Sequence, residues 1–296
     1  MAANTIIMIK HSELILNKNG SVFHLHLLPE NISDKIILVG DPERVNEIAS
    51  LFGRIEFKVQ NREFKTVTGF YNNTRLTIIS TGIGTDNIDI VLNELDALVN
   101  IDLKKREIKK ELKSLDIVRI GTSGSLQPDI PVNAFIVSKK SIGFDGMLNF
   151  YANREKYCDL LFEKAFKQFT NWDDSLPTPY VVDASKALLS KFNDKEFIKG
   201  VTISAPGFYG PQGRKLRLEL AFPELNKKIE EFSFDNLKIA NFEMESSAIY
   251  GLSKMLGHNA LTVCLIIANR VSLTANENYR DDMKKLIIKV LDKLTN

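Results

Sequence analysis

The chain has 296 residues, which suits one large α/β domain or two small ones. Hydrophobic residues make up 44% and charged residues 26%, as in globular proteins, and a net charge of +2 predicts no nucleic-acid partner and no membrane partner. No run approaches the ~20 apolar residues of a membrane span, no signal peptide is recognisable, and the cysteines and histidines lack metal-ligand spacing, so we expect a cytoplasmic protein without a metal cluster.

The N-terminal residues 1–20 are mixed in character, and we expect them to form a loose arm ahead of a single domain over residues 21–296. Residues 21–28 are apolar, and His24 and His26 alternate along them as on an edge strand.

A compact strand is predicted at residues 35–39, followed by a glycine turn at residues 40–44 (GDPER) and an amphipathic helix. A glycine turn between a strand and a helix gathers backbone N–H groups, which favours an anion at Gly40. Arg44 falls in the first helical turn, where the helix dipole disfavours a cation. Arg44 is therefore either a ligand-binding side chain or a solvated one.

Three successive strands are predicted at residues 54–59, 64–70 and 74–79. A second strand–glycine–helix junction follows at residues 80–84 (STGIG), and its two glycines are too few for a dinucleotide fingerprint. Residues 103–113 carry Glu and Lys at i,i+3 and i,i+4 spacing, which predicts a solvated helical insert.

An arginine interrupts the apolar strand predicted at residues 116–120. Burying Arg119 is costly unless its charge is matched. The glycines and hydroxyls of residues 121–125 (GTSGS) follow directly, and we expect them to form an anion-binding loop. Arg119 beside this loop therefore predicts a phosphate site.

The C-terminal half contains predicted strands at residues 134–137, 180–182, 198–203 and 261–268, and predicted helices at residues 153–169 and 276–294. The loop at residues 206–214 (PGFYGPQGR) is rich in chain-breaking residues, which is typical of a functional loop. Phe208, Gln212 and Arg214 offer an aromatic face, an amide and a guanidinium. Together these groups match a planar heterocycle with adjacent carbonyl and N–H groups.

Residues 241–248 (NFEMESSA) join a predicted strand to a predicted helix that Gly257 can close. The carboxylates of Glu243 and Glu245 suit a vicinal diol such as a ribose, and Met244 offers a soft apolar floor. The alternative is that acidic residues stand at a helix N-terminus because the dipole favours them there.

In order and spacing, these motifs resemble the nucleoside phosphorylase superfamily and, within it, the uridine phosphorylases most closely. The matching segments span most of the chain and are residues 23–25, 40–45, 62–64, 80–84, 119–124, 208–214 and 242–246. The resemblance implies an α/β fold, with a single three-layer αβα domain and a central mixed, partly barrel-like β-sheet flanked by helices. It also implies a homo-oligomer, with a dimer as the minimum and a hexamer as the larger form.

The resemblance further assigns roles to individual residues. The phosphate site would comprise Gly40, Arg44, Arg119 and Thr122, with Arg62 from a neighbouring subunit. The ribose site would comprise Thr122, Glu243, Met244 and Glu245, with His24 of the neighbour. The base site would comprise Phe208, Gln212 and Arg214. No cofactor is implied beyond inorganic phosphate as a co-substrate, although a monovalent cation near Glu63 is a further option.

The implied activity is the phosphorolysis of uridine to uracil and ribose 1-phosphate. Alternatives are a purine nucleoside phosphorylase or a nucleosidase of the same fold, and a nucleoside-binding protein without catalysis. The arginines of the phosphate site favour phosphate over water, and Asn269 stands where purine members of the superfamily carry an acid. Both Arg119 and Glu245 are present, which favours an enzyme. The sequence does not separate uridine from thymidine or 2′-deoxyuridine.

Overall fold

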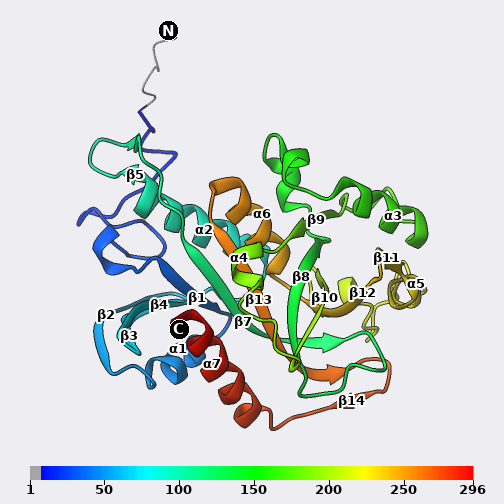
Figure 1. Ribbon diagram of the computed structural model, residues 1–296. Helices are drawn as coiled ribbons and strands as arrows, with labels where there is room; N and C mark the ends of the chain where they lie inside the picture. The colour runs from blue at the N-terminus through cyan, green and yellow to red at the C-terminus, as the bar shows by residue number, and fades with distance from the viewer. Residues whose placement is uncertain (1–7, 296) are drawn as a thin grey trace.

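The computed structural model describes residues 8–295, which form a layered α/β structure (Figure 1). The strands of the main sheet are β1 (Lys35–Val39), β2 (Arg54–Asn61), β3 (Phe64–Tyr71), β4 (Thr74–Ser80), β7 (Asp116–Ser125), β8 (Phe135–Gly143), β9 (Tyr180–Asp183), β10 (Phe197–Ser204), β11 (Ser233–Phe234), β12 (Leu237–Glu243), β13 (Asn259–Asn269) and β14 (Thr274–Ala275). The helices are α1 (Pro42–Ala49), α2 (Thr85–Asn100), α3 (Leu160–Thr170), α4 (Lys186–Leu189), α5 (Leu225–Glu231), α6 (Ser246–Leu256) and α7 (Arg280–Thr295). A separate small hairpin pairs β5 (Ile101–Asp102) with β6 (Glu107–Ile108).

The main sheet is partly closed into a barrel. Its strand order is β11-β12-β10-β8-β13-β7-β1-β4-β3-β2, and β12 pairs in addition with β7. The strands β12, β10, β8, β13 and β7 therefore form a closed ring, from which β1, β4, β3 and β2 continue as an open sheet. Parallel and antiparallel pairs both occur, so the predicted mixed, partly barrel-like sheet is confirmed.

Helices cover both faces of the sheet, as predicted. α1 contacts β1, β3 and β4, whereas α6 contacts β8, β10 and β13 and packs against α2. Figure 1 shows α1 and α7 together on one side of the sheet, with α2 and α6 on the other. No helix within residues 8–295 has both the length and the apolar character needed to cross a membrane.

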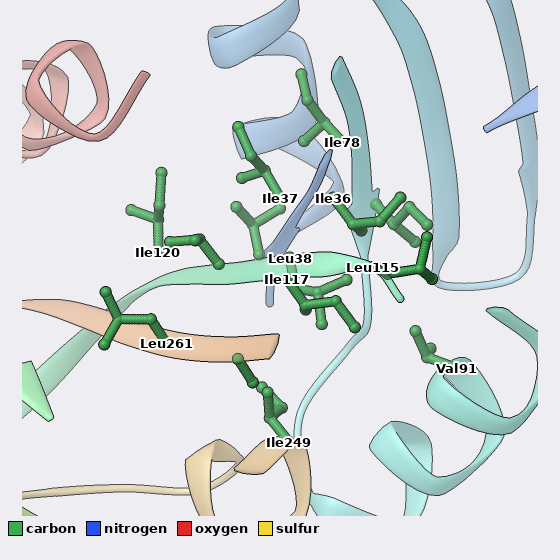
Figure 2. Close-up of a cluster of buried hydrophobic side chains, with 14 of the residues drawn as sticks. Ile36, Ile37, Leu38, Ile78, Val91, Leu115, Ile117, Ile120, Ile249 and Leu261 are labelled. Atoms are coloured by element: carbon green, nitrogen blue, oxygen red, sulfur yellow. The ribbon is translucent and has the colours of Figure 1, made fainter. Parts of the chain in front are cut away.

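The core between the layers is aliphatic because the parallel strands at its centre are buried on both faces. Figure 2 shows this centre, where buried side chains from several strands and helices meet: Ile36, Ile37, Leu38, Ile78, Val91, Leu115, Ile117, Ile120, Ile249 and Leu261. A second cluster, which includes Phe162, Phe166 and Phe232, fills the space beside α3 and α5. Tight packing on both sides gives the strand ends a rigid base.

The charged segment at residues 103–113 is not a helix, so this prediction was wrong. It contains β6 of the small hairpin and the turn that joins β5 to β6, in which Arg106 takes a left-handed φ of 60°. Strands of two residues are too short to leave a period in the sequence, whereas the charge pairs imitate a helix. Arg106 is also buried, with 7% of its surface exposed, and is therefore not part of a solvated face.

The described part of the N-terminal arm, residues 8–20, is held against the domain and is not loose. The Arg106 guanidinium donates to the carbonyl oxygens of Ile9 at 2.9 Å, of Lys10 at 3.2 Å and of Leu14. The amide of Ile9 in turn donates to the Arg106 carbonyl at 2.8 Å. Residues 1–7 of the predicted arm lie outside the described residues.

Two predicted backbone conformations differ from the structure. Residues 21–28 form no strand: Val22 makes only an isolated bridge with Leu16, residues 23–25 form a turn, and His26 takes a left-handed φ of 55°. The GTSGS segment is not a loop, because β7 continues through it to Ser125. Hydrogen bonding explains the extension: this part of β7 pairs with β13 along one edge and with β12 along the other.

Both long C-terminal helix predictions begin too early. α3 begins at Leu160, where the Asp159 side chain accepts the N–H of Phe162 and caps the helix. α7 begins at Arg280, because the chain still follows β13 at Asn276, whose N–H donates to the Ile267 carbonyl at 2.9 Å. The predicted end of α6 is confirmed, since Gly257 takes the left-handed φ of 82° that a glycine cap requires.

Replacing Arg106 by Met is expected to lower the free energy of unfolding by ~2–3 kcal/mol, the scale of charged hydrogen bonds to carbonyls that become unsatisfied. Urea denaturation measures this change. Lys105→Met is the matched control, because the neighbouring Lys105 is exposed and its Nζ lies 3.9 Å from Asp102, a surface pair of little value. Equal losses in the two variants would show that Arg106 does not anchor the arm.

Candidate active site

A cavity of about 800 Å³ opens where the ends of β1, β4, β7, β12 and β13 meet. Ends of parallel strands are where α/β sheets commonly bind ligands. The cavity is lined by every residue that the sequence assigned to the site within one subunit: Gly40, Arg44, Arg119, Thr122, Phe208, Gln212, Arg214, Glu243, Met244 and Glu245. The fold thus brings together segments that lie more than two hundred positions apart.

One end of the cavity, formed by Gly40, Arg44 and Arg119, is suited to an anion and is called the anion end here. The α1 helix starts there because the Asp41 side chain accepts the N–H of Glu43 and Pro42 takes a first-turn position. Burial lowers the pKa of Arg44, and its buried Nε has no hydrogen-bond partner among the described residues. A desolvated guanidinium with an unused N–H is a strong hydrogen-bond donor to an anion.

Arg119 is buried and forms ion pairs with two carboxylates. One Nη donates to a carboxylate oxygen of Glu245, and the other lies 3.5 Å from Glu243. Burial alone would lower the pKa of Arg119, but these two carboxylates outweigh it and raise the pKa, so the guanidinium stays charged. Its Nε is buried without a partner among the described residues and, like that of Arg44, can donate to an anion.

Glu245 is held from two sides. The N–H of Gly84, at the end of the STGIG segment, donates to Glu245 Oε1 at 2.9 Å, while Arg119 occupies Oε2. Gly84 adopts a φ of 105°, which a side chain would strain, so this position needs glycine. The two contacts fix the Glu245 carboxylate at the cavity wall.

Glu243 caps helix α6. Its carboxylate accepts the N–H groups of Glu245 and Ser246 at 3.0 Å, and the hydroxyls of Ser246 at 2.6 Å and Ser204 at 2.5 Å. The helix-terminus explanation for the acidic residues is therefore correct for Glu243. It is not sufficient for Glu245, whose carboxylate contacts Arg119 and Gly84.

A second group of lining residues, Phe208, Gln212 and Arg214, is called the base end here. Arg214 donates to Gln212 Oε1 at 2.5 Å, and its guanidinium carbon lies 3.8 Å from the Phe208 ring centroid. Burial, and then the charge of Arg270, lower the pKa of Arg214 to about 10. The Gln212 side chain is buried and keeps its amide N–H groups for another acceptor.

Tyr279 lines the cavity, and Arg270 does not line it but supports Gln212; the sequence analysis gave neither residue a role. The Arg270 guanidinium donates to the Gln212 carbonyl and lies 5.6 Å from the Phe242 ring centroid. Tyr279, immediately before α7, lines the cavity together with Arg44. Neither residue lies in a glycine-rich junction, so the local motifs gave no signal for them.

Asn269 does not line the cavity, so it is a poor indicator of which base binds there. Its amide donates to the carbonyl oxygens of Gln127 and Ile130 at 2.9 and 2.8 Å, and its Oδ1 accepts the N–H groups of Val271 and Ser272. Asn269 therefore shapes the turn after β13.

His24 and Arg62 lie outside the set of residues that line the cavity. His24 Nδ1 lies 2.6 Å from Glu94 Oε1, and the carboxylate also accepts the backbone N–H of His24. Arg62 occupies the β2–β3 turn with a left-handed φ of 55°. Their assignment to a neighbouring subunit remains a prediction.

Glu63 lines the cavity next to Gly82 and Asn87. The resemblance leaves open a monovalent cation beside this residue. Within residues 8–295, no group of three or more His, Cys, Asp or Glu side chains is arranged to hold a metal ion. The cation option therefore also remains a prediction.

Comparison with known proteins agrees with this geometry. A model described as "Phosphorylase superfamily" matches residues 34–295, and the chain belongs to this family. A uridine phosphorylase of Thermococcus kodakarensis is 28% identical over 86% of this chain and 80% of its own length. A guanosine phosphorylase of Halorubrum lacusprofundi is 27% identical over 91% of this chain and 92% of its own length.

A solved structure supports the same assignment. The Trypanosoma brucei nucleoside phosphorylase, which shows uridine phosphorylase activity, superposes with a TM-score of 0.83 at 28% identity. The superposition covers 95% of this chain and 99% of that protein. The family and the fold therefore agree.

Gly121→Ala is expected to weaken anion binding by ~30-fold, or ~2 kcal/mol. A Cβ on Gly121 would lie 1.9 Å from Arg119 Nη1 and would displace the guanidinium. The measurement is the rise in melting temperature that inorganic phosphate produces. Gly53→Ala is the control, because a Cβ there meets no atom within 4 Å. A phosphate effect that is equal in both variants would contradict an anion role for Arg119.

Proposed function

We propose that this protein cleaves uridine by phosphorolysis, giving uracil and ribose 1-phosphate. The observation that carries the proposal is that three sets of groups line one cavity: two arginines that each have a buried, unused Nε–H, two fixed carboxylates, and a Phe–Gln–Arg cluster. These three sets match phosphate, ribose and base. The uridine phosphorylases among its relatives, at 27–28% identity over most of the chain, support the same activity.

At the anion end, Arg44 and Arg119 would bind inorganic phosphate through their free N–H groups, with the backbone of Gly40 and the hydroxyl of Thr122 beside them. Binding there places the phosphate next to the carboxylates that would hold the ribose. A bound nucleophile in the correct place replaces a bimolecular encounter, which is a large part of the catalytic effect.

In the middle of the cavity, Glu245 would accept hydrogen bonds from the ribose hydroxyls, and Met244 would contact the sugar ring. The transition state of glycosidic cleavage resembles an oxocarbenium ion, so nearby negative charge stabilises it. Arg119 contacts Glu245 and has an unused Nε–H, and it would thereby fix the distance between phosphate and sugar.

At the base end, Gln212 and Arg214 would bind the carbonyl and N–H groups of uracil, with Phe208 against the ring. Negative charge moves onto the base as the bond breaks, and Arg214, whose hydrogen bonds go to the uncharged Phe208 carbonyl and Gln212 amide, would stabilise it. Uracil spreads this charge over two carbonyls and needs no protonation. A purine leaving group would instead require an acid at this end to protonate it. Within residues 8–295, neither Gln212 nor Arg214 forms a hydrogen bond with an Asp or Glu side chain.

We further propose that the enzyme acts in the cytoplasm as a homo-oligomer, with a dimer as the minimum, and that it needs no cofactor besides phosphate. His24 and Arg62 would complete the partner's site, with Arg62 at the phosphate and His24 at the ribose. Neither residue lines the cavity of its own chain, which supports this assignment. In a two-fold contact each subunit would contribute equally to the other.

Release of uracil from uridine is expected to require phosphate and to produce ribose 1-phosphate in equal amounts, as measured by chromatography with and without phosphate. Arg44→Met should lower the rate by ~100-fold, the scale of a lost charged hydrogen bond. Arg54→Met is the control, since Arg54 is exposed on β2. Equal uracil release in phosphate-free buffer would indicate a hydrolase. Cleavage of inosine or guanosine at a rate equal to that of uridine would overturn the pyrimidine assignment.

Inactive Arg62→Ala and Arg119→Ala variants, unfolded and refolded as an equal mixture, should regain about a quarter of the unaltered activity. Half of the dimers would be mixed, and each would contain one intact site. Absence of recovery, when mixed dimers are shown to form by native mass spectrometry, would place both arginines in the site of one chain.

A further inference from the structure

The Arg119 side chain lies along its own strand β7, over Gly121, and does not point away from the strand. A Cβ added to Gly121 would lie only 1.9 Å from Arg119 Nη1, so the guanidinium occupies the space beside this glycine. Gly121 pairs in register with Cys264 of the neighbouring strand β13. The guanidinium is thus laid over the glycine toward the side chain of Cys264.

Cys264 is the third group that contacts this guanidinium. Arg119 Nη1 lies 3.7 Å from Cys264 Sγ, within the range of an N–H donated to sulfur. The two other contacts are the carboxylates of Glu243 and Glu245. Nε alone is left without a partner among the described residues, so the three contacts determine which edge of the guanidinium is free for an anion.

The chemistry of sulfur suits this position. Burial raises the pKa of the Cys264 thiol to about 12, so the side chain is neutral at physiological pH. A neutral, weak acceptor orients an N–H without adding charge. A third carboxylate here would compete with phosphate for Arg119, and an aliphatic side chain would leave Nη1 with only the longer contact to Glu243, at 3.5 Å.

We propose that Cys264 is a positioning residue for phosphate: its sulfur holds the Arg119 guanidinium over Gly121 so that Nε faces the anion end. Cys264 would act through Arg119 and would touch neither phosphate nor nucleoside. The inference rests on the proposed phosphorolysis.

The test varies phosphate and uridine separately in steady-state assays of the full-length protein. Cys264→Ala is expected to raise the KM for phosphate by ~10-fold, while the KM for uridine and kcat stay within about twofold. Cys264→Ser, which restores a neutral acceptor of similar size, should recover most of the phosphate affinity. Cys264→Asp should raise the KM for phosphate by a further ~10-fold or more, because its carboxylate would occupy Arg119.

Cys158→Ala is a matched control. Cys158, the only other cysteine of the chain, also neighbours an arginine that is paired with a glutamate, Arg154 with Glu163 at 2.9 Å. Neither of those partners lines the cavity, so Cys158→Ala should leave both KM values unchanged. Thermal melting by circular dichroism establishes that each variant is folded, and the Ala and Ser variants decide the question if the Asp variant does not fold.

An unchanged KM for phosphate in Cys264→Ala, with the unaltered enzyme dependent on phosphate, would overturn the inference and leave the proposed function intact. An equal rise of both KM values would also overturn it, because that is the signature of a general loss of structure. Uracil release that needs no phosphate in the unaltered protein would instead reject the proposed function.

Discussion

The ion pair between Arg119 and Glu245 is the interaction on which the site depends. Arg119 comes from β7 and Glu245 from the junction of β12 with α6, so the pair joins two parts of the sheet at the point where β7 and β12 close the ring. Burying two charges is costly, and only further hydrogen bonds make it tolerable. Gly84 and Cys264 supply those bonds from two other segments. Four stretches of chain are thereby held in one arrangement by a single charged contact.

Small residues make this arrangement possible. Gly121 gives the Arg119 side chain room to lie flat, and Gly84 presents an N–H from a backbone angle that other residues avoid. Behind the cavity wall, the hydroxyls of Ser204 and Ser246 hold Glu243 and so fix the start of α6. The carboxylates of Glu243 and Glu245 are thus held by several hydrogen bonds each, and these charges need not move when a ligand arrives.

Much of the site could be predicted because its motifs are local. The turn from β1 into α1 is encoded in adjacent residues, as is the β12–α6 junction, and Arg44 stands out there because the dipole disfavours it. What could not be predicted depends on contacts between distant residues. Arg106 anchors residues 9–14 from a turn whose charge pattern resembles that of a helix. Asn269 lies outside the cavity lining, and its amide binds a backbone carbonyl in the segment that follows β7. The roles of His24 and Arg62 depend on a second chain, which one sequence does not describe.

Arg44 and Tyr279 line the cavity together, although they come from nearly opposite ends of the chain. Contacts of such long sequence separation form late, because the loop between them must be closed first. During synthesis, the sheet can begin to assemble as its strands emerge, but this wall of the cavity is absent until the segment before α7 has left the ribosome. A chain that ended before Tyr279 would therefore lack that wall, however well its earlier strands were packed.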